Sequence, residues 1–336
     1  MPRLDLELVT ACDHGCGHCY NVWGSPEGTY ARGRLPTDRY LEMLERLLDD
    51  TGARSLTFTG GEPLLHPDAL KILRRARERV EDVHLVTNGS HVTPRVAEAL
   101  GGLGLASVQL TLLSADPARH DEFKGAPSFH ATVQAALDLR DAGVPVQACF
   151  VATARNGADF EDVMGLWHLL GVRSLSYNRM APTGAAVHRR AELLPTVAQV
   201  EAHLEIAERL GPAYGMAVAT AMPVPPCLVR PERYRWVSFG FCSTGSASPN
   251  LVVDPVGQVR SCNLSSGVLG NLLVEDWPTL WGRIQEYQAR FRATTPPVCR
   301  GCTYEASCQG GCKESALAAF GDLRHPEPFL HQVAGP

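Results

Sequence analysis

The chain has 336 residues, of which 45% are hydrophobic and 20% charged, as is ordinary for a soluble globular protein long enough for a large barrel and a smaller domain. The net charge of −5 argues against nucleic-acid binding, and no apolar run approaches the roughly 18 residues of a membrane span. The N-terminus has no signal-peptide core, so we expect a cytoplasmic protein. Eleven cysteines in such a chain indicate metal ligation and not a disulfide framework.

The expected elements alternate between strand and helix. Apolar runs predict strands at residues 4–9, 55–59, 83–87, 107–113, 146–153 and 174–180. Helical spacing predicts helices beginning at Thr37 and at residues 68–80, 94–100, 129–141, 160–170 and 195–211. Repeated β-α units predict a parallel α/β sheet, most simply a barrel or part of one. Polar and glycine-rich turns follow these strands, at the end of the sheet where barrel chemistry belongs.

Three cysteines follow the first expected strand with C-x3-C-x2-C spacing: Cys12, Cys16 and Cys19. Thiolates spaced in this way suit either an iron–sulfur cluster or zinc. Three thiolates on a four-iron cluster leave one iron open to another ligand. A zinc site would instead take its fourth ligand from His14 or His18. These residues alone leave both interpretations open.

A Gly-Gly-Glu-Pro turn, residues 60–63, follows the second expected strand. Glycines let the backbone approach a ligand closely because no Cβ is in the way, and Glu62 supplies an acceptor for an ammonium group. Together with the cysteine spacing one strand earlier, the turn resembles the radical S-adenosylmethionine (SAM) superfamily.

The resemblance implies a partial (β/α)6 TIM-like barrel with a [4Fe–4S] cluster on Cys12, Cys16 and Cys19, whose open iron binds SAM. It also implies that the Gly-Gly-Glu-Pro turn contacts the SAM amino group. The SAM-binding residues implied in this way are Tyr20, Gly60, Gly61, Glu62, Pro63, Asn88, Gln109, Ser114 and Arg179.

A second group of cysteines lies near the C-terminus. A β-hairpin is expected at residues 250–253 and 258–261, and further cysteines follow with C-x2-C-x5-C-x3-C spacing. This region resembles the SPASM extension, which binds one or two auxiliary iron–sulfur clusters. The resemblance assigns the first cluster to Cys242, Cys262 and Cys312 and the second to Cys299, Cys302 and Cys308, and we expect Cys227 to complete the first.

The sequence departs from the SPASM pattern at Leu330, where a seventh cysteine is expected. His325, Glu327 or His331 could replace the missing thiolate, an iron could stay open, or the second site could be vestigial. We expect three regions: the barrel at 1–195, a bridging helix and Pro-rich linker at 196–235, and a small cysteine-rich SPASM domain with a hairpin and helices at 236–336.

By resemblance, the function is reductive cleavage of SAM to a 5′-deoxyadenosyl radical that takes hydrogen from a residue of a ribosomally made peptide or protein, giving a crosslink or an oxidised residue. A sulfatase-type formylglycine maturase and an enzyme acting on a small molecule are the competing enzymatic interpretations. An iron–sulfur electron carrier would gain nothing from Gly-Gly-Glu-Pro. The substrate, the bond formed and any catalytic acid or base are not determined by the sequence.

Expected partners are the peptide or protein substrate and a flavodoxin- or ferredoxin-type electron donor. Because the first expected strand begins at Leu4, no room is left for a fused N-terminal recognition domain. Either a separate peptide-recognition protein presents the substrate, or the barrel mouth and the loop at residues 23–35 suffice.

Overall fold

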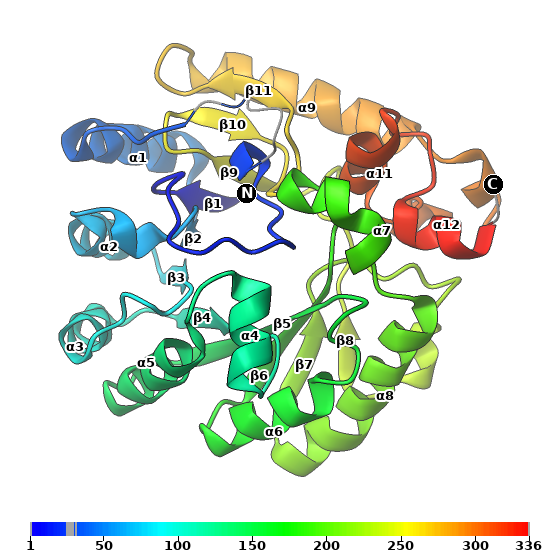
Figure 1. Ribbon diagram of the computed structural model, residues 1–336. Helices are drawn as coiled ribbons and strands as arrows, with labels where there is room; N and C mark the ends of the chain where they lie inside the picture. The colour runs from blue at the N-terminus through cyan, green and yellow to red at the C-terminus, as the bar shows by residue number, and fades with distance from the viewer. Residues whose placement is uncertain (1, 25–29, 31, 335–336) are drawn as a thin grey trace.

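The computed structural model describes residues 2–24, 30 and 32–334, so that part of the loop at 23–35 lies outside the described residues. Its strands form one sheet that curves through the molecule (Figure 1). The strands are β1 (Arg3–Glu7), β2 (Ser55–Thr59), β3 (Asp82–Val86), β4 (Ser107–Thr111), β5 (Val146–Ala152), β6 (Ser174–Arg179), β7 (Ala217–Thr220), β8 (Val237–Phe239), β9 (Asn250–Val253), β10 (Gln258–Arg260) and β11 (Val268–Asn271).

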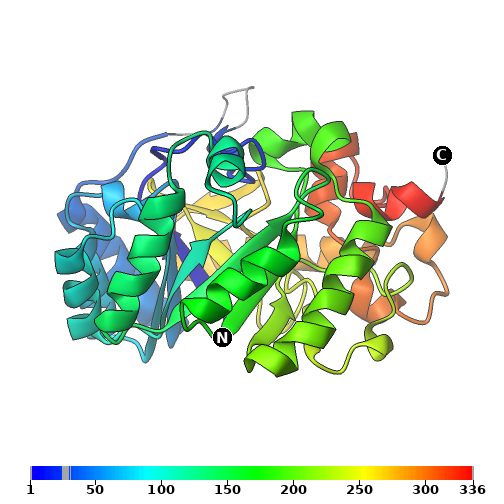
Figure 2. The ribbon, with the colours of Figure 1, turned by 60° about the horizontal axis from the view of Figure 1, so that its bottom comes forward.

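The helices are α1 (Thr37–Thr51), α2 (Ala69–Arg77), α3 (Pro94–Leu103), α4 (Pro117–Lys124), α5 (Phe129–Asp141), α6 (Phe160–Leu169), α7 (Arg190–Leu193), α8 (Val197–Tyr214), α9 (Trp277–Ala293), α10 (Glu305–Cys308), α11 (Lys313–Phe320) and α12 (Pro328–Ala334). Helices α1, α2, α3, α5, α6, α8 and α9 lie on the outer face of the curved sheet, whereas α4 lies over the ends of the strands (Figure 1 and Figure 2). No described helix is both long and apolar enough to cross a bilayer.

The sheet has the strand order β11-β10-β9-β1-β2-β3-β4-β5-β6-β7-β8. Each neighbouring pair from β1 to β8 is parallel, as the alternation of strands and helices predicts. β9 also pairs in parallel with β1, with Arg3 opposite Asn250 and Leu6 opposite Val253. The predicted hairpin is confirmed as the antiparallel pair β9 and β10.

Strands from the regions expected to form the bridge and the small C-terminal domain join the barrel sheet. The expected bridge contains β7, which extends the barrel sheet beyond β6. The C-terminal hairpin extends the same sheet at its other end, beside β1. The sequence pattern did not reveal β7 because its four residues, Ala-Val-Ala-Thr, are too short for a clear alternation.

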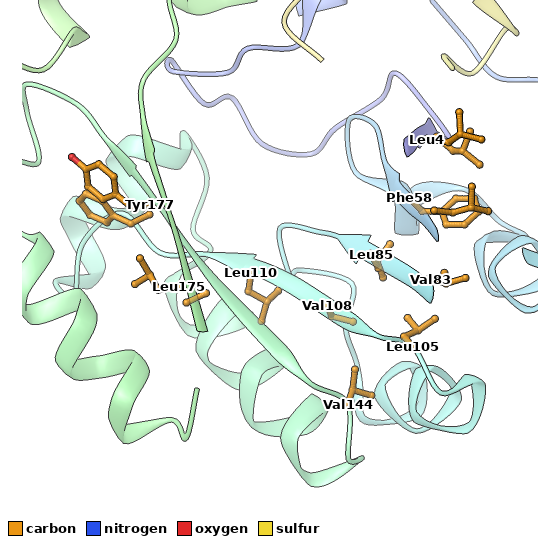
Figure 3. Close-up of a cluster of buried hydrophobic side chains, with 14 of the residues drawn as sticks. Leu4, Phe58, Val83, Leu85, Leu105, Val108, Leu110, Val144, Leu175 and Tyr177 are labelled. Carbon is orange, nitrogen blue, oxygen red and sulfur yellow. The ribbon is translucent and has the colours of Figure 1, made fainter. Parts of the chain in front are cut away.

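Alternation along the strands decides what faces the helices and what faces the barrel interior. Leu4, Phe58, Leu85 and Tyr177 belong to the apolar layer between the sheet and the helices (Figure 3). The intervening residues include polar ones that contact each other across strands, as where Asn178 Nδ2 donates to the sulfur of Cys149 at 3.4 Å. The apolar layer holds the barrel together, while its interior keeps polar groups beside the functional site.

Candidate functional site

The cysteine loop is fastened to the Gly-Gly-Glu turn by its backbone. Gly61 N–H donates to the carbonyl of Val9, and Glu62 N–H donates to the carbonyl of Ala11, each at 2.8 Å. A Cβ at Gly60 would lie 2.6 Å from the Val9 oxygen, and one at Gly61 would lie 2.0 Å from the Ala11 oxygen. Both glycines are therefore required by the close approach of these two loops, whatever ligand the site holds.

Cys12, Cys16 and Cys19 line one cavity of about 520 Å³ at the carboxyl ends of the strands. All three are free thiols. Four of the residues implied to bind SAM line the same cavity: Tyr20, Gly60, Gly61 and Asn88. Residues that the sequence pattern did not assign to SAM also line it: Thr10, Asn21, Trp23, Thr87 and Lys124.

The thiols fit a metal centre that brings its own positive charge. Burial raises the pKa of Cys19 to about 12 and also raises the pKa of Cys12. A bound cation lowers the pKa of a coordinating thiol, so an iron cluster would stabilise the thiolate form that burial disfavours. No three His, Cys, Asp or Glu side chains in the described part of the chain converge as they would on a single metal ion. A four-iron cluster instead spreads its thiolates over separate irons.

The two histidines considered as zinc ligands have other surroundings. His14 Nε2 is 3.0 Å from the Ser90 hydroxyl. Desolvation, together with the nearby charges of Lys124 and Arg189, lowers the pKa of His18 to about 3. Within the described residues, neither histidine converges with two or more of the cysteines as a single zinc ion would require.

Glu62, whose carboxylate is expected to accept from the SAM amino group, is not among the residues that line the cavity. It is fully buried, and its carboxylate accepts hydrogen bonds from Thr87 Oγ1 and Asn88 N at 2.7 Å and from Leu64 N at 3.0 Å. Burial raises the pKa of Glu62, whereas these hydrogen bonds lower it. Its role in the structure is to position the end of β3.

Asn88 connects the end of β3 to the cysteine loop. Its Nδ2 donates to Asp13 Oδ1 at 2.7 Å, and Asp13 stands directly after Cys12. Glu62, Asn88 and Asp13 thus form a chain of contacts from the buried carboxylate to the loop that carries the thiols.

Three other expected SAM-binding residues lie outside the cavity lining. Pro63 is buried at the start of a short 3-10 helix, Pro63–Leu65, behind the turn. Gln109 lies on β4, and it is Thr111, two residues further along, that lines the cavity. Ser114 is buried and donates to Asp159 Oδ1 at 2.5 Å, so its hydroxyl ties α6 to the end of β4.

Arg179, another residue expected to bind SAM, makes a buried ion pair. Its Nη2 donates to both Glu327 oxygens, at 2.6 and 2.5 Å, and both side chains are fully buried. The guanidinium also lies 4.6 Å from the centre of the Phe329 ring. The pair joins β6 to α12. Glu327, which was considered as a replacement cluster ligand, is therefore engaged by Arg179.

Helix α4, which supplies Lys124 to the cavity, was not among the elements expected from the sequence. The Lys124 carbonyl accepts a hydrogen bond from Gly15 N at 3.0 Å, so the helix end supports the cysteine loop. The available signal was an Asp116-Pro117 start, with Asp116 capping the helix, and Gly125 as its left-handed C-cap. The sequence of this helix has no strong apolar stripe, so periodicity does not reveal it.

The C-terminal cysteines form two groups that differ from the expected ones. Cys227, Cys299, Cys302 and Cys308 line one small cavity together with Leu330. The neighbouring charged groups that raise the pKa of Cys262, after burial, are Glu314, Cys242 and Cys312. The structure therefore places Cys227 with the second expected set and not with the first.

The two histidines considered as replacement ligands for the second set are occupied elsewhere. His325 stacks on Phe320 with ring centres 3.8 Å apart, and His331 lies 5.8 Å from the same ring. Neither histidine lines the cavity that contains Leu330.

Comparison with known proteins agrees with this site. The family model described as the radical SAM superfamily matches residues 6–170. A PqqA peptide cyclase from Ruegeria pomeroyi is 28% identical, covering 96% of this chain and 85% of the relative. Mycofactocin maturase MftC from Mycobacterium tuberculosis is 26% identical, covering 97% and 81%. An AdoMet-dependent heme synthase from Methanosarcina barkeri is 26% identical, covering 98% and 96%.

Solved structures share the fold over nearly the whole chain. Streptococcus suis SuiB bound to its precursor peptide SuiA superposes with a TM-score of 0.79 at 17% identity, covering 98% of this chain and 76% of SuiB. The enzyme anSMEcpe with bound AdoMet superposes with a TM-score of 0.75 at 16% identity, covering 98% and 94%. Residues 6–170 thus form a radical SAM domain.

Proposed function

We propose that this radical SAM enzyme acts in the cytoplasm on a residue of a ribosomally made peptide or protein and leaves a crosslink or an oxidised residue. The observation that carries the proposal is the alignment with PqqA peptide cyclases over 96% of this chain, which includes both C-terminal cysteine groups. The shared fold with SuiB, which was solved with its precursor peptide, supports a mouth that admits a peptide.

In this proposal Cys12, Cys16 and Cys19 hold the [4Fe–4S] cluster of the family, and SAM occupies the remaining cavity beside them. When bound, the cluster supplies the low-potential electron that cleaves SAM to a 5′-deoxyadenosyl radical. The chain's own contribution is to hold the thiols on a loop fastened to Gly60 and Gly61. The barrel around the cavity limits access of water to the reacting atoms.

A flavodoxin- or ferredoxin-type protein is the proposed electron donor, and the mouth of the barrel is the proposed peptide entry. Arg32 lines the cavity, and its Nη2 donates to the Trp23 carbonyl at 2.8 Å. A guanidinium at this place favours an acidic segment of the peptide or of a separate recognition protein.

A second candidate function is favoured by a specific observation. Heme synthases of two organisms align with 96–98% of this chain, and the chain covers 90–96% of their length. This end-to-end agreement supports a small-molecule substrate, a tetrapyrrole precursor of heme, as the second candidate.

The test compares the two substrates on one preparation of anaerobically reconstituted enzyme with SAM and dithionite. The peptide arm uses synthetic peptides encoded by short reading frames beside the gene. We expect loss of hydrogen from a peptide by mass spectrometry, together with 5′-deoxyadenosine. Conversion of a tetrapyrrole precursor to heme, with every peptide unchanged, would overturn the proposal in favour of the small-molecule substrate.

A further inference from the structure

The four cysteines of the second C-terminal group come from two distant segments. Cys299, Cys302 and Cys308 belong to one short stretch, in which Cys302 N donates to the Cys299 carbonyl at 3.2 Å. Cys227 reaches them from the Pro-rich segment that follows β7. All four line one cavity, and Leu330 lines it too. The residue that replaces the seventh SPASM cysteine is therefore at this site, with Cys227 beside it.

The backbone on both sides holds the thiols in place. Leu228 and Val229 donate their N–H groups to the Pro225 carbonyl at 3.0 and 3.1 Å, which forms a turn around Cys227. Val229 is fully buried and anchors this turn to the core. On the other side, a Cβ on Gly310 would lie 2.6 Å from Pro296, so only glycine lets the chain close around these thiols.

We propose that Cys227, Cys299, Cys302 and Cys308 together ligate the second auxiliary cluster, with Cys227 supplying the thiolate that is absent at Leu330. The inference rests on the iron–sulfur part of the proposed function and is independent of the substrate. Four thiolates are the full complement for a four-iron cluster. The second cluster is thus closed, although the SPASM pattern lacks its last cysteine.

The incomplete ligand set then belongs to the first auxiliary cluster. Cys242, Cys262 and Cys312 supply three thiolates, and the Glu314 carboxylate contacts Ser261, the residue before Cys262. Its Oε1 accepts hydrogen bonds from Tyr287 Oη and, at 3.2 Å, from Ser261 Oγ. A carboxylate or an exogenous ligand at this iron would distinguish the first cluster from the second.

The test is a rescue experiment on full-length, anaerobically reconstituted protein. Iron and sulfide content, Mössbauer spectra and the rate of iron loss to a chelator are measured for each variant. Cys227→Ser should accelerate iron loss from one auxiliary cluster on the order of tenfold. Adding Leu330→Cys to Cys227→Ser should restore the parental rate, because a thiol then enters the same cavity from the other side. The matched control is Leu330→Cys added to Cys242→Ser, which should give no rescue.

Several outcomes would overturn the assignment. An unchanged iron-loss rate in Cys227→Ser would do so, as would failure of Leu330→Cys to restore it. The assignment would also be contradicted if Cys227→Ser still accelerated iron loss in a protein whose Cys299, Cys302 and Cys308 are all replaced by Ala. SAM cleavage measured on the same samples reports on the barrel cluster, so failure of the proposed enzymatic function is distinguishable from failure of this assignment.

Discussion

The two cysteine-bearing regions of the molecule are built in opposite ways. The barrel thiols, Cys12, Cys16 and Cys19, lie within eight residues of a single loop. The C-terminal thiols are drawn from positions spread between Cys227 and Cys312. Ligands gathered within one loop are recognisable from their spacing, whereas ligands gathered from distant segments depend on how the chain folds back. The comparison explains why Cys227 was expected in the first C-terminal group and lies in the second.

The supports of the two regions differ too. The barrel loop is fastened by backbone hydrogen bonds to the glycine turn. The C-terminal region is joined to the barrel by strand pairing at β1 and by the buried ion pair of Arg179 and Glu327. Backbone contacts survive most substitutions, while an ion pair is lost with a single one. The regions should therefore respond differently to mutation.

The largest expected effect is the complete loss of SAM cleavage with the C-terminal iron retained. Replacing Cys12, Cys16 and Cys19 together with Ala should abolish 5′-deoxyadenosine formation, because the SAM-cleaving cluster loses every protein ligand. The C-terminal iron should stay bound, as measured by iron and sulfide analysis. The matched variant, with Cys299, Cys302 and Cys308 replaced by Ala, should lose the iron of the second auxiliary cluster and keep SAM cleavage. Undiminished 5′-deoxyadenosine formation in the first variant would contradict the assignment of Cys12, Cys16 and Cys19 to the SAM-cleaving cluster.

The next effect is on the connection between the regions. Glu327→Gln leaves the Arg179 guanidinium buried without its counterion, and breaking a buried pair in this way costs about 3–5 kcal/mol of unfolding free energy. The double variant Arg179→Met, Glu327→Leu removes both charges and should recover most of that loss. Urea unfolding under anaerobic conditions compares the three proteins. Equal stability of the single variant and the parent would mean that the pair contributes nothing.

The third effect tests whether Glu62 acts through its neighbours. Glu62→Ala removes the acceptor for Asn88 N–H and for the Thr87 hydroxyl, bonds to a charged group worth about 1.5–3 kcal/mol each. The affinity for SAM should fall about tenfold or more by calorimetric titration. Thr87→Val, which removes one of these bonds, should cost less. If Glu62→Ala binds SAM as tightly as the parent, the end of β3 does not depend on this carboxylate.

The smallest effect is a pH dependence at the junction of β1 and the C-terminal hairpin. The pKa of Glu7 is raised to about 7: burial raises it most, Arg260, paired with it at 2.5 Å, lowers it, and Asp254 and Asp5 raise it. An unfolded glutamate titrates near 4.5, so between these pH values unfolding releases a proton. The unfolding free energy should therefore fall as pH rises, by at most about 1.4 kcal/mol per pH unit.

The variant Glu7→Gln cannot ionise and should lack this part of the pH dependence. Unfolding midpoints of the two proteins measured between pH 4.5 and 7 show the difference. Parallel pH profiles for parent and variant would contradict the raised pKa.

Elements with a strong local pattern could be predicted from the sequence. The expected strand at 55–59 and helix at 129–141 coincide with β2 and α5, because apolar spacing and clear boundaries mark both. The helix α4 and the strand β7 could not be found in this way. The first lacks an apolar stripe, and the second is four residues long and gains its place by pairing with β6.

The expected site residues divide in the same way, into those marked by the local sequence and those whose side chains bind distant partners. Tyr20, Gly60, Gly61 and Asn88 follow the ends of strands directly or belong to a motif, and all four line the cavity. Ser114 and Arg179 also follow or end strands. Their side chains are taken by Asp159 and Glu327, which stand 45 and 148 residues further along the chain. No local pattern carries the identity of so distant a partner.

The parallel pairing of β1 with β9 also has a consequence for synthesis of the chain on the ribosome. Arg3 meets Asn250, so one side of the first strand has no partner until nearly three quarters of the protein has been made. An unpaired strand edge invites pairing with another chain, and closing so long a loop slows folding. The N-terminal strand, with the cysteine loop at its end, therefore keeps one edge open to pairing with other chains until residues 250–253 have left the ribosome and paired with it.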